Sequence, residues 1–184
     1  MSLTKFYKFC EHCVGKWTTE RTYHYLTHQE IERSRTEFKI YPLSSALKLK
    51  VIADNQYNSS PQIEQSPGFS LAFHTVSDKG EELSQQLNLL FVPKIENGLT
   101  LEGDYLRDKA YEESCPIVSH FCFESDTREL VMTTRYTRVV SRDFITLVNP
   151  SLRIRRMYNY QRPPKGQPLD KMILVGFGVE HKER

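Results

Sequence analysis

Arginine residues are concentrated in one stretch of the chain, RDFITLVNPSLRIRRMYNY, at residues 142–160. In an extended strand after the Asn149-Pro150 turn signal, Arg153 and Arg155 share one face, because side chains alternate along a strand. Guanidinium groups bind carboxylates bidentately and keep their charge, so the pair suits a ligand with two carboxylates. The same pattern is also explained by a basic strand face exposed to solvent. Judged on the pattern alone, this second interpretation is slightly favoured over carboxylate binding. One basic strand in a nearly neutral chain is poor evidence for nucleic-acid binding.

A second candidate segment is CVGKWTTERTYHYL, which contains the only tryptophan of the chain, Trp17. Its strand-like part contains Arg21 and His24, whose odd spacing puts them on opposite faces of a regular strand. Both can point inward only if the strand has a bulge. A packed or surface histidine is as good an interpretation of His24 as a ligand contact, and Arg21 could stack on Trp17. Further along, Arg107 and Asp108 are expected to form a structural ion pair.

The cysteines raise the question of metal or redox chemistry through the spacing Cys10-Glu11-His12-Cys13. Apolar residues at 6, 9, 10, 13 and 14 nevertheless form the stripe of an amphipathic helix, which Thr4 could cap and Gly15 could end. A second Cys/His pair at zinc-finger spacing is missing. Buried thiols are therefore preferred to a metal site, and a redox pair comes third.

Length and composition limit the possibilities further. The 184 residues fit one domain spanning 1–184, and the net charge of +2 gives no global attraction to nucleic acid or a membrane. No apolar run approaches the length of a membrane span, and the first residues lack the apolar core of a signal peptide. We expect a soluble, non-secreted chain, with a plastid transit peptide already removed as an open alternative.

Most of the chain reads as short strands. Residues 17–26 and 30–41 predict a hairpin, residues 44–56 a short helix, and residues 57–68 the longest unpatterned loop. Further strands are expected within 69–76, 87–95, 99–107, 116–124, 129–140, 144–149, 152–160 and 172–181, with SRD at 141–143 among the turns. About eight to ten strands behind one helix favour a closed antiparallel barrel, which removes exposed sheet edges.

The sequence Gly15-Lys16-Trp17 leads from the predicted helix into the first strand. It resembles the entry to lipocalin-type barrels, in which a tryptophan plugs one end. A barrel of this size can enclose one small molecule, so the architecture suggests a binder before it suggests a reaction.

Three stretches together resemble the S-type phycobiliprotein lyases of the CpcS/CpeS family. They are VGKWTTERTYHYL, GLTLEGDYLRDKAYEESCPIVSHFCF and TTRYTRVVSRDFITLVNPSLRIRR, in order and with consistent spacing over most of the chain. The resemblance implies a lipocalin-like β-barrel that binds a phycobilin, a linear tetrapyrrole, noncovalently. It further implies transfer of this substrate to a cysteine of a phycobiliprotein subunit, forming a thioether.

The resemblance assigns functional roles to five residues. The bilin-binding positions of the family fall on Arg21, His24, Arg153 and Arg155, and its acidic residue falls on Asp143 as the catalytic group. This sequence departs from the family pattern at Asp143-Phe144, where relatives usually have glutamate followed by arginine. Arg135 replaces an acidic residue, and Phe69 or Phe73 takes the place of mid-chain tryptophans. These departures bear on which bilin is preferred.

The expected partners follow from the same resemblance. They are phycoerythrobilin or phycocyanobilin and an α or β phycobiliprotein subunit, with no permanently bound cofactor, no metal, no nucleic acid and no membrane. A homodimer is possible, and the expected location is the cytoplasm of a cyanobacterium or a plastid. Two alternatives stay open: a lipocalin-like carrier of a hydrophobic acid without transfer activity, and an assembly partner of the antenna.

Overall fold

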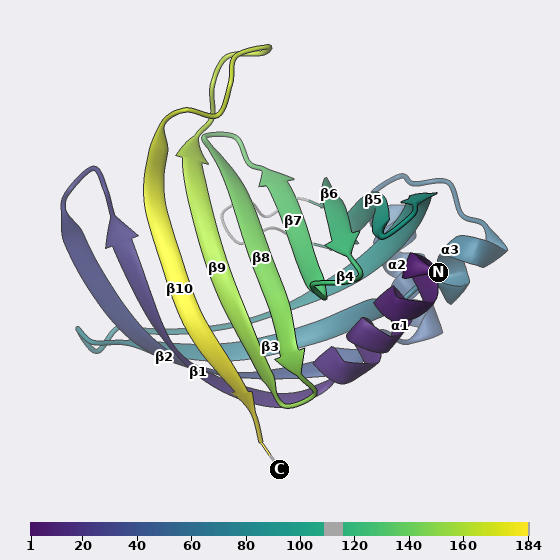
Figure 1. Cartoon of the computed structure of the whole chain (residues 1–184), viewed down its shortest axis with the longest axis horizontal. Helices are drawn as coiled ribbons and strands as arrows, with labels where there is room; N and C mark the ends of the chain where they lie inside the picture. The colour runs from purple at the N-terminus through teal and green to yellow at the C-terminus, as the bar shows by residue number, and fades with distance from the viewer. Residues whose placement is uncertain (109–115, 184) are drawn as a thin grey trace.

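Ten antiparallel strands form a closed barrel in the computed structural model, which describes residues 1–108 and 116–183 (Figure 1). The strands are β1 (Gly15–Tyr25), β2 (Glu30–Pro42), β3 (Gly68–Ser77), β4 (Glu82–Asn97), β5 (Thr100–Arg107), β6 (Ile117–Glu124), β7 (Glu129–Arg135), β8 (Val139–Asn149), β9 (Leu152–Gln161) and β10 (Met172–Lys182). Each strand pairs with its neighbour in sequence, and β1 closes the barrel against β10. The predicted mainly β, closed antiparallel barrel is confirmed.

One predicted turn was wrong. The SRD sequence at 141–143 lies inside β8, and the chain turns instead at residues 136–138, where Tyr136 N donates to Val139 O. Ser141 is buried, so the strand period continues through SRD and places Asp143 on the inner face. A polar tripeptide resembles a turn in sequence, but here its alternate side chains line the inside of the barrel.

The N-terminal helix α1 (Ser2–Cys13) fills one end of the barrel. Figure 1 shows it against β4, β5 and β6, away from the β1–β2 hairpin. The predicted apolar stripe is confirmed, because four of its five positions are buried: Phe6, Phe9, Cys10 and Cys13. The Phe6 ring lies 5.1–5.5 Å from the rings of Phe91, Phe121 and Phe123. This aromatic cluster is the main core of the protein.

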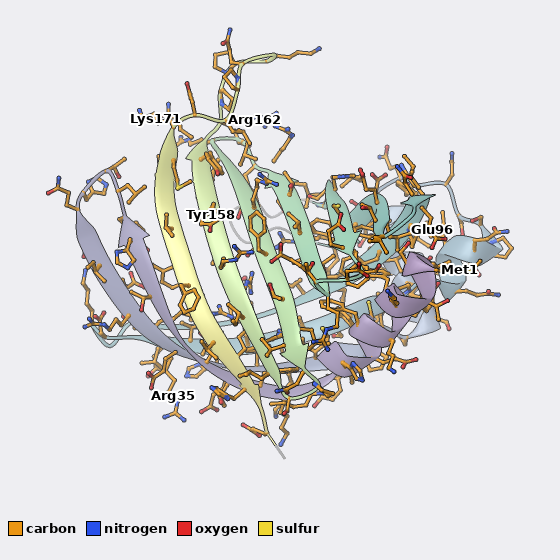
Figure 2. The ribbon with its side chains drawn as sticks, viewed as in Figure 1. Met1, Arg35, Glu96, Tyr158, Arg162 and Lys171 are labelled. Carbon is orange, nitrogen blue, oxygen red and sulfur yellow. The ribbon has the colours of Figure 1, made fainter. Side chains whose placement is uncertain are left out.

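The first turn of α1 is capped by another element and not by the predicted Thr4. Glu96 of β4 accepts hydrogen bonds from Ser2 Oγ at 2.7 Å and from Leu3 N at 3.1 Å. Met1 and Glu96 lie next to each other in Figure 2. These bonds lower the pKa of Glu96. Its negative charge at the helix N-terminus also interacts favourably with the helix dipole.

Trp17 closes the same end of the barrel from β1. Its side chain is fully buried, its Nε1 donates to Cys13 O at 2.9 Å, and its ring stacks on Phe38 at 6.4 Å. Gly15 joins the helix to the strand with φ of +134°, a conformation that other residues rarely adopt. The predicted tryptophan plug is confirmed.

Two further helices cover the outside near β4 and β5. The predicted short helix is α2 (Ser45–Asp54), and its cap Ser44 accepts from Leu47 N. The long loop expected at residues 57–68 contains an additional helix, α3 (Pro61–Gln65), capped by Ser60. The Ser60-Pro61 pair was its sequence signal, because serine caps helices and proline suits their first turn. Within the described residues, no helix is long and apolar enough to span a membrane.

The aromatic core predicts a large penalty for removing its central side chain. Phe6→Ala should lower the free energy of unfolding by about 3–5 kcal/mol, since the ring is fully buried among aromatic neighbours. Urea unfolding followed by circular dichroism measures this loss. Leu3→Ala on the same helix, where the side chain is 36% exposed, is the control and should change stability by about 0.5 kcal/mol or less. Equal effects of the two substitutions would contradict the assigned core.

Candidate functional site

The barrel encloses a cavity of about 610 Å³ that extends from Phe9 and Cys13 of α1 toward the β1–β2 and β3–β4 hairpins. Glu32, Glu81 and Glu82 line it near those hairpins, while one wall is apolar: Phe38, Phe69, Leu71, Phe73, Leu87, Leu89 and Phe91. This volume falls within the range of small-molecule sites. The cavity therefore combines an apolar wall with the charged groups of β1, β8, β9 and β10.

Three charged side chains form a buried cluster at the inner end of the cavity. Glu180 of β10 is fully buried and accepts from Arg21 Nη2 at 3.1 Å and from Arg153 Nε. The Arg153 guanidinium lies 4.5 Å from the centre of the Trp17 ring and 5.2 Å from that of Phe38. Arg153 is thus 4% exposed and forms the floor of the cavity.

Asp143 of β8 and Arg155 of β9 form a second ion pair, next to the first along the cavity wall. Arg155 donates to Asp143 Oδ1 through Nε at 3.0 Å and through Nη2 at 2.7 Å. Asp143 Oδ2 accepts no bond from the described residues, and both side chains keep some exposure, at 14% and 23%. This pair can therefore reach a ligand, whereas Arg153 is occupied by Glu180.

Electrostatics hold Glu180 and Arg155 in their charged forms. Burial would raise the pKa of Glu180, but Arg153, Arg21 and Arg155 outweigh it and lower that pKa. For Arg155, burial acts to lower the pKa, and the Asp143 carboxylate outweighs it, so that pKa is raised. The inner wall therefore carries permanent charges of both signs.

Two glycines of β10 make room for this cluster. A Cβ on Gly178 would lie 2.9 Å from Thr19 Oγ1 and 3.0 Å from Arg21 Cγ, and a Cβ on Gly176 would lie 3.0 Å from the Tyr23 ring. Both glycines face the strand β1, which is paired directly with β10. The sequence VGFGVE thus lets long side chains of β1 cross over the backbone of β10.

The structure does not bring His24 to the cavity. Arg21, Tyr23 and Tyr25 line the cavity, whereas His24 is exposed on the outer face, between Val175 of β10 and Ile31 of β2. β1 runs without a bulge through these positions, so strand alternation separates the two candidates. The suggested stacking of Arg21 on Trp17 was also wrong: Arg21 lies over Phe38, and Arg153 takes the place over Trp17.

The predicted Arg107–Asp108 ion pair was wrong as well. Arg107 faces inward and donates through Nη1 to the Tyr136 hydroxyl at 2.8 Å. Asp108 instead accepts from the backbone and side-chain nitrogens of Asn88, at 2.9 and 2.7 Å. Tyr136 lines the cavity wall, while Tyr158 lies on the outer side of β9 against Phe144, as Figure 2 shows.

Cys10 and Cys13 have the surroundings of structural cysteines. Cys10 and Cys13 are free and buried in α1, and burial raises the pKa of both thiols, which disfavours the thiolate. Cys122 on β6 is also free, and Cys115 lies outside the described residues. No cluster of metal-binding side chains occurs within 1–108 and 116–183. The preference for buried thiols at Cys10 and Cys13 is confirmed.

Sequence reasoning missed Glu180 and the inward orientation of Arg107. Glu180 has a signal in sequence, since it falls at an inner position of the last strand, in register with Thr19 and Arg153. An isolated acidic residue in an otherwise apolar strand, MILVGFGVEH, is a candidate for a buried ion pair. Its partner arginines lie on β1 and β9, far away in sequence, so only the closed barrel reveals the pairing.

A closed barrel with an apolar cavity that arginines also line is the architecture of a protein that binds a small molecule. The sequence matches the family described as CpeS-like protein over residues 5–182. Chromophore lyase CpcS/CpeS 1 of Synechococcus sp. (strain JA-3-3Ab) is 58% identical over 181 residues, covering 98% of each chain. The chain therefore belongs to the CpcS/CpeS family.

More distant relatives of the same family also match this chain. Chromophore lyase CpcS/CpeS of Thermosynechococcus vestitus is 25% identical over 151 residues, covering 80% of this chain and 79% of the relative. The structure of the S-type phycobiliprotein lyase CPES from Guillardia theta superposes with a TM-score of 0.77 at 18% identity, covering 100% of this chain and 94% of that one. This superposition supports the fold.

The buried cluster predicts that Glu180 is essential for stability. Glu180→Gln leaves Arg153 and Arg21 buried without their carboxylate, and should lower the free energy of unfolding by about 3–5 kcal/mol. Glu129→Gln is the matched control: its partner Arg156 is 39% exposed, so the loss should be about 1 kcal/mol or less. Urea unfolding of both variants measures the difference, and similar losses would contradict the role of burial.

The same residue predicts a pH dependence. Because the folded-state pKa of Glu180 is lowered, its contribution to stability is present above the unfolded pKa of about 4.3 and is lost as pH falls through the lower folded value. Thermal unfolding between pH 7 and pH 3 should show this loss in the wild type and a smaller one in Glu180→Gln. Parallel pH profiles would contradict the assignment.

Proposed function

We propose that this protein is a phycobilin lyase that holds a linear tetrapyrrole inside the barrel and attaches it to a cysteine of a phycobiliprotein. The observation that carries the proposal is 58% identity over 98% of the chain to a chromophore lyase, together with the charged cavity. A phycobilin has two propionates, four ring nitrogens and a long apolar surface. The arginines, Asp143 and the apolar wall match these three features.

The transfer is an addition of a thiol to a double bond. The sulfur of the acceptor cysteine bonds to the ethylidene carbon on ring A of the bilin, the double bond is lost, and a proton adds to the adjacent ring carbon. Nothing leaves, so the lyase needs no nucleophile of its own. Its contribution is to orient the bilin, to exclude water and to favour the protonated, electrophilic chromophore.

Individual side chains divide this work. Asp143 is the catalytic candidate, since its Oδ2 can accept from pyrrole N–H groups while Arg155 holds Oδ1. Arg155 and Arg21 are partly accessible from the cavity and can contact propionates. Arg153 supports them by anchoring Glu180. His24 has no such role in this proposal, because it lies on the outer face.

The remaining specifics belong to the same proposal. The substrate is phycocyanobilin or phycoerythrobilin, the acceptor is an α or β subunit of phycocyanin or phycoerythrin type, and a homodimer is compatible with the barrel. The expected location is the cytoplasm of a cyanobacterium or a plastid. Coexpression with each bilin pathway and single acceptor subunits tests these points, with covalent attachment detected by absorption under denaturing conditions. Bilin binding without attachment to any subunit would indicate a carrier, and subunit binding without bilin an assembly partner.

The role of Asp143 gives a spectroscopic prediction. Asp143→Asn removes the negative charge at constant shape, so bound bilin should absorb further to the blue and transfer should slow by about one to two decades. Asp143→Glu restores a carboxylate and should recover most of both properties. Asp126→Asn, at an exposed acid that pairs with Lys5, is the control. A wild-type spectrum and rate in Asp143→Asn would contradict the assignment.

The burial of the helix thiols predicts that they take no part in transfer. The double variant Cys10→Ser and Cys13→Ser should attach bilin at the wild-type rate, because the attacking thiol belongs to the acceptor. Rates are compared after circular dichroism shows that the variant is folded. A folded double variant that binds bilin but does not transfer it would return these thiols to the mechanism.

A further inference from the structure

Arg107 is the one cavity arginine without a carboxylate partner among the described residues. Arg21 and Arg153 share Glu180, and Arg155 binds Asp143. Arg107 donates one bond, through Nη1, to the neutral hydroxyl of Tyr136. Its Nε is buried and has no hydrogen-bond partner. A guanidinium that keeps its charge is thus held in the wall with no carboxylate bonded to it in the described parts of the chain.

The burial of Arg107 makes this arrangement costly. The residue is 8% exposed, and its neighbours on the inner face include Tyr105, whose hydroxyl contacts Thr134. An ionised side chain with so little access to water is costly to bury unless it is paired with an opposite charge or fully hydrogen-bonded. The cavity carboxylate Asp143 accepts its two hydrogen bonds from Arg155.

The charged side chains of the inner cavity also carry an excess of positive charge. Among the described residues, four arginines line the cavity, and the carboxylates bonded to them are Asp143 and Glu180, while the other lining acids lie near the β1–β2 and β3–β4 hairpins. Of those, Glu32 accepts from Tyr25 at 3.3 Å. The inner wall is therefore complementary to a ligand that brings two negative charges. The sequence suggested Arg153 and Arg155 for such a ligand, but Arg153 is already neutralised by Glu180.

We infer that Arg107 is a carboxylate-binding residue of the cavity and takes one of the two propionates of the bound tetrapyrrole. This inference rests on the proposed function. Arg107 lies on β5 and reaches Tyr136 at the end of β7, whereas Arg21 and Arg155 lie on β1 and β9. Propionates held by residues of these different strands would fix the rotation of the tetrapyrrole inside the barrel. Orientation of ring A toward the acceptor thiol would then depend on Arg107.

The test compares free bilins with their dimethyl esters, which have the same shape and no propionate charge. Phycocyanobilin and phycoerythrobilin are titrated, in both forms, into wild-type protein and Arg107→Gln. The substitution should weaken binding of the diacid by about 10- to 100-fold, as expected for a lost charge-assisted bond, and leave the affinity for the dimethyl ester unchanged. Arg35→Gln is the matched control, because Arg35 is 69% exposed and points away from the barrel (Figure 2).

The outcomes separate the inference from the proposed function. Equal losses for diacid and ester would mean that Arg107 only supports the wall through Tyr136, and an unchanged diacid affinity would mean that it does not touch the ligand; either result overturns the inference alone. If wild-type protein binds neither bilin, the proposed function fails and the inference with it. If Arg107→Gln does not fold, Arg107→Lys decides: it keeps the charge but loses the planar fork, so a smaller loss confined to the diacid is expected.

Discussion

A single buried carboxylate, Glu180, sets the geometry on which the rest of the cavity depends. It is fully buried, and it binds arginines from β1 and β9 while lying on β10 between them. Such a cluster tolerates little displacement, because each charge has lost its water and depends on the others. The three strands are thereby fixed in register at the point where the first strand of the chain meets the last.

Closure of the barrel and exclusion of water reinforce one another at this end. The rings of Trp17 and Phe38 lie against the guanidinium groups of Arg153 and Arg21, so the plug and the ion pairs form one continuous structure. Low polarity around fixed charges strengthens their interaction with a charged ligand. The apolar plug therefore contributes to binding as well as to stability.

The two ends of the cavity differ in character, and this difference suits a transfer reaction. The inner end is closed and rich in arginine, whereas Glu32, Glu81 and Glu82 line the part near the β1–β2 and β3–β4 hairpins. A tetrapyrrole anchored through its carboxylates at the inner wall would direct its remaining rings toward those hairpins. An acceptor thiol could then reach the bilin without entering the core of the lyase.

The sequence by itself determined the barrel, the helix stripe, the tryptophan plug and the strand that bears Arg153 and Arg155. These are local patterns, since alternation, helical spacing and turn residues are read over about ten neighbouring positions. Even so, the polar SRD stretch was mistaken for a turn, and the short helix after Ser60 was missed.

The carboxylate that each arginine binds was decided only by the tertiary structure. Glu180 lies 27 residues from Arg153 and 159 from Arg21, and Arg107 bonds Tyr136, 29 residues away, and not its neighbour Asp108. Which buried charges pair with each other depends on strands that come together only when the barrel closes.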